Sequence, residues 1–149
     1  MTTTEQVKAL RDKTGISIMQ CQKALEEAGG DEIKALALLE EKGAAIALKK
    51  SDRTLGAGVV EAYVHNTGKM GAMILLQSET DFVAQNPEFK SLAREIAMHV
   101  AAMGTIDREK VILEPFIKDP SKTVGDLITQ ATQKFGERIL LAEVSRISQ

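Results

Sequence analysis

"VVEAYVHNTGKMGAMILLQ", residues 59–77, predicts a β-hairpin. Residues 59–64 and 72–77 are mostly β-branched or aliphatic, and such runs favour strands. The segment between them, "HNTGKMG", supplies the Asn and Gly residues that suit a tight reversal of the chain. We therefore expect two neighbouring antiparallel strands here and interpret the segments on either side around them.

A helix is predicted directly after the hairpin, over residues 87–103. Pro87 fits the first helical position, Asn86 fits the cap before it, and Gly104 is typical of a helix end. Apolar residues at helical spacing predict one buried stripe, made of Phe89, Leu92, Ala93, Ile96, Val100 and Met103.

The remaining C-terminal residues predict two further strands and one helix. "VILEPFIK" (111–118) is strand-like, but Pro115 cannot donate to a ladder and places that strand at an edge or a bulge. "DPSK" (119–122) is expected to turn the chain, Thr123 to cap a last helix, and "RILLAEVSRI" (138–147) to form a final strand. The order ββαβαβ, with helices on one face of a mainly antiparallel sheet, indicates a small α+β domain.

The N-terminal part of the chain predicts three short helices. The first can be capped by Thr3 or Thr4 and stops at Gly15, where the missing Cβ permits a left-handed turn. The second begins with a capping-box pair, Ser17 and Gln20. Helices this short are marginal singly, so we expect them to pack as one bundle.

Asp31 is expected to cap the third helix, which should end at Gly43. Its inward residues are predicted to be Ile33, Leu36, Ala37 and Leu39. The domain organisation predicted from these signals is a three-helix bundle over 1–43, a linker over 44–55 and an α+β core domain over 56–149.

Composition excludes several classes of protein. The 149 residues, 44% of them hydrophobic, can bury a core, and a formal net charge of -2 disfavours duplex binding through phosphate neutralisation. The single Cys21 and two histidines offer no cluster at zinc spacing, so no metal site is expected. No secretory signal or membrane-spanning apolar run is recognised, so we expect a soluble cytoplasmic protein that binds neither membrane nor nucleic acid.

The sequence holds no complete motif for chemistry. No GxxxxGK[ST] occurs, which disfavours nucleotide binding by the chain itself. Glu79 and Asp81 would share one face if the strand continued through them, like the paired carboxylates of a hydrolase. Cys21 lies on an apolar helical face, which favours a packed thiol over a nucleophile. His99 flanks the apolar stripe and is expected to be half-exposed.

Phe82 in "SETDFVAQN" (78–86) is a candidate functional residue, because aromatic residues make up only 3% of the chain. Large aromatic side chains usually bury themselves, so Phe82 could fold back as a lid on the small core. The alternative is a wedge that protrudes between the strand and the helix. Sequence physics leaves both alternatives open.

Several segments resemble one known family, the bacterial translation elongation factor Ts family. They are "VKALRDKTGISIMQCQKAL" (7–25), "GAAIALKKSDR" (43–53), "ETDFVAQN" (79–86), "IAMHVAAM" (96–103), "PFIKDPSKTVGDLI" (115–128) and "GERI" (136–139). The run TDFV is the most specific of these matches, and the first twenty-odd residues are nearly as telling.

The resemblance implies a guanine-nucleotide exchange factor for elongation factor Tu that binds the GDP form, expels GDP and is displaced when GTP enters. It implies no bond-making, and therefore no catalytic residue and no cofactor. In this family the N-terminal bundle resembles a ubiquitin-associated domain and grips the partner's GTPase domain, while an Asp-Phe tip pushes in near the magnesium of the nucleotide. Phe82 is then expected to be the wedge and Asp81 the polar group beside it.

Carried over residue by residue, the resemblance assigns partner contacts to two regions and one further position. The N-terminal contact residues are Lys8, Leu10, Arg11, Gly15, Ile18, Met19 and Cys21. The tip residues are Thr80, Asp81, Phe82 and Val83, and the further position is His99. The family usually has more charge around residues 18–23 than this chain does, so the resemblance implies an apolar contact there more than a salt bridge.

Two other functions remain open at this stage. A ubiquitin-associated-like adaptor would need only the bundle, and it would leave Asp81 and Phe82 without a function. A small hydrolase would need Glu79 and Asp81 to act together.

The length of the chain bears on its assembly. Long members of the family carry two core subdomains and a helical coiled coil, whereas "GTIDREKV" (104–111) here leads almost directly into the predicted edge strand. The resemblance implies that short members of the family pair as homodimers, and the sequence leaves both a homodimer and a monomer that acts alone open. If a dimer forms, its contact should involve the proline-free final strand or the helical face beside it.

Overall fold

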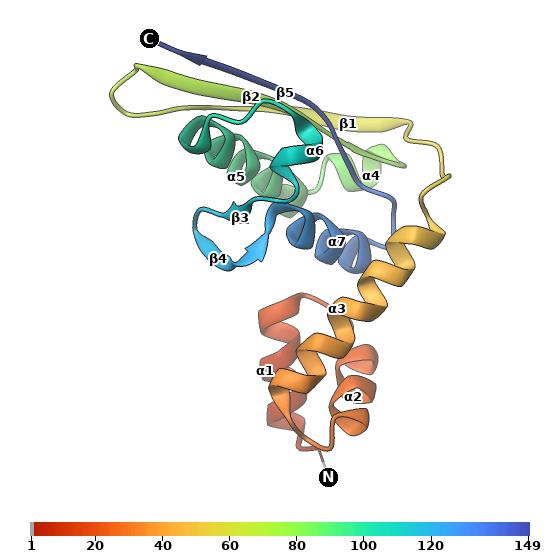
Figure 1. The fold of residues 1–149 in the computed structure, drawn as a ribbon. Coiled ribbons are helices and arrows are strands. Elements are labelled where there is room, and N and C mark those ends of the chain that lie inside the picture. The colour runs from red at the N-terminus through yellow and green to blue at the C-terminus, as the bar shows by residue number, and fades with distance from the viewer. Residues whose placement is uncertain (1) are drawn as a thin grey trace. The chain divides into compact units, whose positions relative to one another are not determined.

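The computed structural model describes residues 2–149 and divides the chain into two compact units. The first, the helical unit, comprises the chain up to Ser51 together with Thr129–Gly136. The second, the sheet unit, comprises Asp52–Ile128 and Glu137–Gln149. Figure 1 shows the elements of both. The predicted class is confirmed, since N-terminal helices precede an α+β region with an antiparallel sheet.

The helical unit begins with α1 (Thr4–Thr14), α2 (Ile18–Glu27) and α3 (Glu32–Lys49). Thr3 and Gln6 form a capping box at the start of α1, and Gly15 ends this helix with φ at 69°. The Ser17 hydroxyl accepts a backbone N–H of α2 at 3.3 Å, and the Asp31 carboxylate accepts two from α3. The predicted starts of these helices are therefore confirmed.

A continuous apolar core joins these three helices into a bundle. Cys21 is fully buried within it, as predicted for a packed thiol. Helices of this length are marginal in water on their own, so their stability depends on this shared core. The buried residues are Val7, Leu10, Ile16, Cys21, Ala24, Leu25, Ala35 and Leu39.

The third helix differs from its prediction in both length and orientation. It does not end at Gly43 but continues through it, and Ile33, predicted to lie inside, is 80% exposed. The buried positions are Ala35, Leu39 and Gly43, which repeat every fourth residue. A Cβ at Gly43 would lie 2.7 Å from Gln133 Oε1 of the same unit, so this glycine permits close packing and does not mark a helix end. Of the other predicted core residues, Leu36 is half-buried and Ala37 is exposed.

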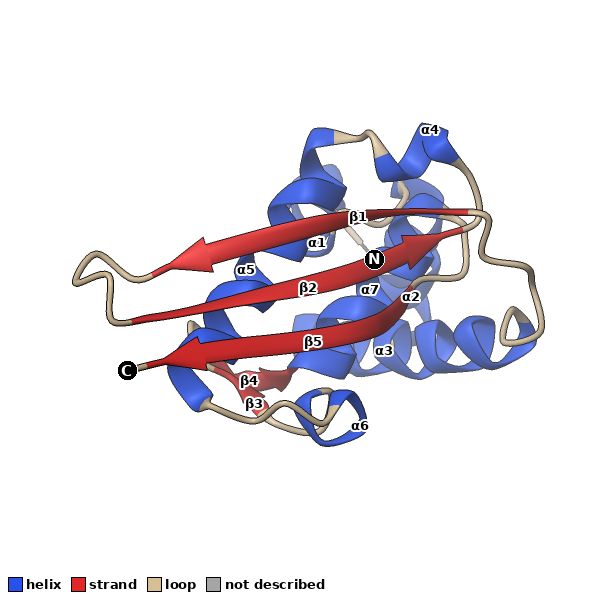
Figure 2. Ribbon diagram, turned by 90° about the horizontal axis from the view of Figure 1, so that it is seen from above, coloured by secondary structure: helices blue, strands red, loops and turns tan. Residues whose placement is uncertain are grey.

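The sheet contains β1 (Ala57–Val64), β2 (Met70–Ser78) and β5 (Leu140–Ser148), in the order β1-β2-β5. Both pairings are antiparallel, with Val60 opposite Leu75 and Ile74 opposite Val144. The hairpin predicted from residues 59–77 is therefore confirmed, and β5 lies at an edge of the sheet (Figure 2).

The helix α5 (Pro87–Met103) packs on β1 and β2 and covers one face of the sheet (Figure 2). Its ends are as predicted, because the Asn86 side chain caps the first turn and Gly104 terminates the helix at φ 83°. Met103, predicted to lie inside, is in the last turn and is 46% exposed, and Leu92 is half-buried. The rest of the predicted stripe is buried: Phe89, Ala93, Ile96 and Val100.

The strand predicted over 111–118 is wrong. The Asp107 carboxylate accepts the Glu109 N–H and starts the short helix α6 (Arg108–Val111), so the first residue of that segment is helical. Only β3 (Pro115–Phe116) is extended, and it pairs with β4 (Asp119–Thr123) in a separate two-stranded sheet. The turn expected at "DPSK" (119–122) is wrong as well, because these residues form most of β4 and the chain turns just before them, at residues 117–118. The last helix, α7 (Val124–Phe135), is capped by Thr123 as predicted, with a 3.0 Å bond from Asp126 N.

Candidate functional site

The tip, residues 80–83, protrudes from the sheet unit where β2 gives way to α5. Its residues belong to the one-turn helix α4 (Asp81–Ala84) and to Thr80, which precedes it. The Phe82 side chain is 88% exposed, whereas Val83 is 4% exposed and Ala84 is fully buried. Phe82 is therefore not a lid on the core, and its geometry is that of a protruding wedge.

Local bonds and burial hold this turn in place. Ala84 N donates to Thr80 O at 3.2 Å, and Gln85 N donates to Asp81 O at 2.9 Å. The buried side chains of Val83 and Ala84 attach the turn to the core of the sheet unit. Because burial fixes these two neighbouring positions, the Phe82 ring is left on the solvent side of the turn.

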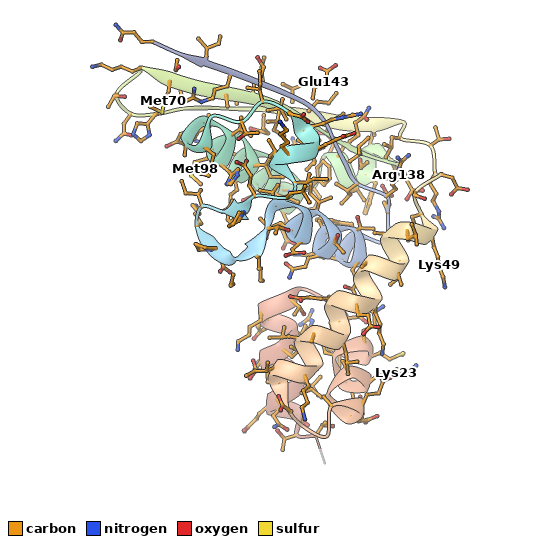
Figure 3. All side chains as sticks on the ribbon, in the orientation of Figure 1. Lys23, Lys49, Met70, Met98, Arg138 and Glu143 are labelled. Atoms are coloured by element: carbon orange, nitrogen blue, oxygen red, sulfur yellow. The ribbon has the colours of Figure 1, made fainter. Side chains whose placement is uncertain are left out.

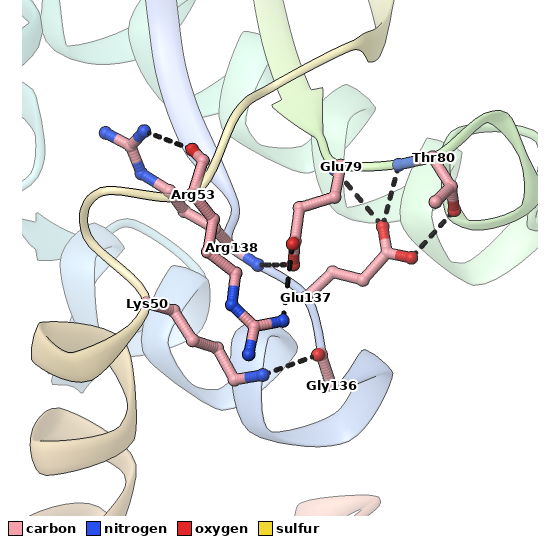
Figure 4. Close-up of polar contacts among 7 residues, drawn as sticks. All are labelled: Lys50, Arg53, Glu79, Thr80, Gly136, Glu137 and Arg138. Atoms are coloured by element: carbon pink, nitrogen blue, oxygen red, sulfur yellow. Dashed lines mark hydrogen bonds and ion pairs between the residues drawn. The ribbon is translucent and has the colours of Figure 1, made fainter.

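A glutamate from the start of the final strand region also contacts the tip. Glu137 Oε1 accepts the backbone N–H of Glu79 at 3.1 Å and that of Thr80 at 3.0 Å. Glu137 Oε2 accepts the Thr80 hydroxyl at 2.7 Å (Figure 4). We call these three contacts the clasp. Sequence reasoning missed Glu137; its only signal is its place in the "GERI" match to the family.

The two carboxylates suggested for a hydrolase do not form a pair. Strand β2 ends at Ser78, so the alternation that would bring Glu79 and Asp81 to one face stops before them. Glu79 Oε2 accepts the backbone N–H of Arg138 at 2.7 Å, and its Oε1 lies 3.4 Å from the Arg53 guanidinium (Figure 4). Asp81 is exposed at the start of α4. The Glu79 carboxylate therefore has a structural role, because both of its oxygens already contact neighbouring segments.

The residues assigned to N-terminal contacts divide into two groups within the helical unit. Leu10 and Cys21 are fully buried and belong to the bundle core. Ile18 and Met19 are 56% and 68% exposed at the start of α2, where they present apolar side chains to solvent. Lys8, Arg11 and Gly15 are exposed as well.

His99 is fully buried, so the expectation of a half-exposed side chain is wrong. Ile117 N donates to its Nδ1 at 3.1 Å, which places the proton of the neutral ring on Nε2. That nitrogen lies 3.2 Å from Glu114 Oε1, and the ring stacks on Phe116 with centroids 5.9 Å apart. With both nitrogens bonded, an imidazole is readily accommodated inside, and His99 joins α5 to the β3 region.

Residues 2–149 lack two other kinds of feature. They bring together no group of three or more His, Cys, Asp or Glu side chains that could hold a metal ion. No helix among them is both long enough and apolar enough to cross a membrane.

Comparisons with known proteins point to one family. The family described as "Elongation factor TS" matches residues 79–149. A relative named "Elongation factor Ts" from Carboxydothermus hydrogenoformans is 39% identical over 184 aligned positions, covering 93% of this chain and 85% of the relative. Proteins of the same name from Thermodesulfovibrio yellowstonii and Leptospira biflexa are 37% and 38% identical, cover 97% and 95% of this chain, and are each covered over 94% of their own length. These alignments are longer than the 149-residue chain, so the relatives carry residues inside the matched region that this chain lacks.

Phe82→Ala should leave the free energy of unfolding within about 0.5 kcal/mol of that of the unchanged protein, since it removes an exposed side chain. Phe89→Ala is the matched control, because the Phe89 ring is fully buried and its loss should cost about 3–5 kcal/mol. Denaturant unfolding followed by circular dichroism compares the two. A loss at Phe82 as large as that at Phe89 would place the Phe82 ring in the core.

Proposed function

The chain belongs to the elongation factor Ts family, a family of translation elongation factors, and we propose that it is a guanine-nucleotide exchange factor for elongation factor Tu. The observation that carries this proposal is the Phe82 side chain, 88% exposed on a turn whose next two residues are buried. Within the family resemblance, this is the residue that pushes in near the nucleotide. The protein makes and breaks no bond in this role, and it acts in the cytoplasm.

A protruding ring can expel GDP because a bound nucleotide depends on a single arrangement of its surroundings. Mg²⁺ and the backbone N–H groups that face the phosphates must all be in place, so a small displacement of these elements strongly lowers the affinity for GDP. Thermodynamic linkage makes the effect reciprocal: if this protein weakens GDP binding, GDP weakens the binding of this protein by the same factor. The complex with both ligands is therefore short-lived, as turnover requires.

Affinity for the partner needs a surface other than the tip. Ile18 and Met19 support this role, because they are adjacent, apolar and mostly exposed at the start of α2. Apolar side chains that remain exposed on a folded bundle gain free energy when a partner covers them. We assign affinity for the partner, called the grip below, to this pair and to the exposed Lys8 and Arg11. The action of Phe82 on the nucleotide site is called the push. The buried Leu10 and Cys21 shape the surface from beneath.

The two alternative functions have less support. An adaptor that uses only the helical unit leaves the exposure of Phe82 without a purpose. A hydrolase needs an available carboxylate pair, and the Glu79 carboxylate already accepts the Arg138 N–H and faces Arg53.

Catalytic amounts of this protein should accelerate the release of fluorescent GDP from elongation factor Tu in a stopped-flow experiment. Phe82→Ala should lower the maximal rate about 30-fold, because a central aromatic hot spot is worth about 2 kcal/mol or more. Leu113→Ala is the control, since Leu113 is another apolar side chain of the sheet unit that is 74% exposed. An unchanged rate of GDP release at saturating wild-type protein, with binding established, would contradict the exchange function.

Ile18→Ala combined with Met19→Ala should raise the half-saturating concentration about tenfold and leave the maximal exchange rate largely intact, because these side chains supply affinity and not the push. Ile33→Ala is the control in the same unit, at a side chain that is 80% exposed. A titration of the exchange rate against protein concentration separates the two quantities. A fall in the maximal rate at unchanged half-saturation would refute this division between grip and push.

A homodimer is the assembly that we propose for this short chain, and the outer face of the sheet supports it. Its register places Val60, Val64, Met73 and Ile147 on one face, and these side chains are 60%, 67%, 50% and 78% exposed. The helix α5 packs on the opposite face, where Ile74 is buried. Apolar side chains gathered on an open face are typical of an interaction surface. Ile147 belongs to the edge strand β5, for which the sequence predicted a dimer contact.

Light scattering across a concentration series should give a mass that rises from monomer to dimer. Met73→Glu should shift the equilibrium toward the monomer, because it would place a charge inside the apolar contact. Ile33→Glu, an exposed position of the helical unit, should leave the equilibrium unchanged. A constant monomer mass of the wild-type protein up to high concentration would exclude the homodimer.

A further inference from the structure

We propose that Glu137 is a positioning residue for nucleotide exchange: its carboxylate holds the base of the tip so that Phe82 stays aimed at the partner. This inference rests on the exchange function proposed above. The family resemblance assigns contacts to the tip itself but gives Glu137 no role. The clasp shown in Figure 4 carries the argument.

The clasp acts at the point where the sheet stops supporting the chain. Strand β2 ends at Ser78, and α4 begins at Asp81. The two backbone N–H groups in between, those of Glu79 and Thr80, both donate to Glu137 Oε1. One carboxylate oxygen thus binds both backbone N–H groups of this connection, and bonds to a charged acceptor are the stronger kind. The Ser78 hydroxyl adds one neutral bond, to Thr80 O at 3.0 Å.

Thr80 shows that the tip depends on Glu137 rather than on a cap of its own. It occupies the N-cap position of α4 in an extended conformation, but its side chain makes no capping bond. Its hydroxyl instead donates to Glu137 Oε2 at 2.7 Å. A helix of a single turn has little stability by itself, so a contact from outside it sets its orientation.

The clasp is itself held in return. Glu79 Oε2 accepts the backbone N–H of Arg138, the residue next to Glu137. The Arg138 guanidinium donates to Arg53 O at 2.8 Å, and Arg53 faces Glu79 Oε1. Glu137 therefore binds the backbone of residues 79 and 80, and Glu79 binds the backbone of Arg138. Neither segment can rotate without breaking hydrogen bonds to the other.

This arrangement affects the push more than the grip. The tip is attached at its far end by the buried Val83 and Ala84 and at its near end by the clasp. If the near end is released, the Phe82 ring can tilt when it meets the partner. The ring then displaces the nucleotide-binding elements less, and GDP is released more slowly. Precise placement of a functional group by its supporting residues is a general requirement of such sites. Affinity supplied by the helical unit does not depend on the clasp.

Glu137→Ala should lower the maximal rate of GDP release about tenfold, equivalent to about 1.4 kcal/mol, while the half-saturating concentration stays nearly unchanged. Glu137→Gln should recover most of this rate, because the amide oxygen can accept both backbone N–H groups and the Thr80 hydroxyl can turn to accept from the amide nitrogen. Glu109→Ala, at an exposed glutamate of α6, is the matched control and should behave like wild type. Glu143 of β5 (Figure 3) is unsuitable as a control, because the register places it on the outer face proposed for the homodimer.

Amide hydrogen exchange, followed by NMR on the protein alone, tests the clasp without elongation factor Tu. The Glu79 and Thr80 amides should exchange about tenfold faster in Glu137→Ala, whereas amides in the middle of β2 should be unaffected. If wild type failed to release GDP, the exchange function would fall and these amides would still decide whether Glu137 holds the tip. If Glu137→Ala does not fold, Thr80→Val decides, because it removes only the bond to Oε2 and should lower the maximal rate about threefold.

Three results would overturn the inference. The first is wild-type protection of the Glu79 and Thr80 amides in folded Glu137→Ala. The second is a full maximal rate in that variant despite loosened amides. The third is a higher half-saturating concentration at an unchanged maximal rate, which would show that Glu137 contributes to affinity for the partner.

Discussion

Packing of α5 on the β1–β2 hairpin is the interaction on which the rest of the sheet unit depends. Phe89 enters the core in the first turn of α5, and the buried alanines Ala93 and Ala97 let the helix approach the sheet closely. The end of β2 and the start of α5 are thereby fixed, and residues 79–86 must join the two. Val83 and Ala84 turn into the same core. The exposure of Phe82 follows from this constraint, because the next two residues of the same helical turn, Val83 and Ala84, are buried.

Elements with local signals could be predicted from the sequence. The hairpin and α5 carry their turn, cap and periodicity within a few residues, and the structure has them as expected. The direction of Phe82 could not be derived in the same way, because an aromatic residue in a loop can turn inward or outward. What decides is the burial of Val83 and Ala84, which depends on tertiary packing. Glu137 was beyond local reasoning for the same reason: its partners lie far away in the sequence and meet it only after folding.

The incorrect expectations share a physical cause. The residue type of Gly43 predicts a helix end, whereas its role in the structure is to let Gln133 approach. The position of His99 beside the apolar stripe predicts a half-exposed side chain, but Glu114 and the Ile117 N–H satisfy its ring inside. The apolar character of residues 111–118 predicts a strand, although the Asp107 cap just before them starts a helix. In each case a contact with a distant residue or a preceding cap outweighed local preference.

The motif carried over from the family combines two physical classes of residue, and only the structure separates them. Leu10, Cys21 and Val83 are buried, so a change at any of them alters the shape that the surface residues rest on. Ile18, Met19 and Phe82 are exposed, so in the isolated protein they contribute little to folding. Large apolar side chains in exposed positions add little to the stability of the isolated fold. We propose that their role is to contact a partner, as the proposed exchange function requires.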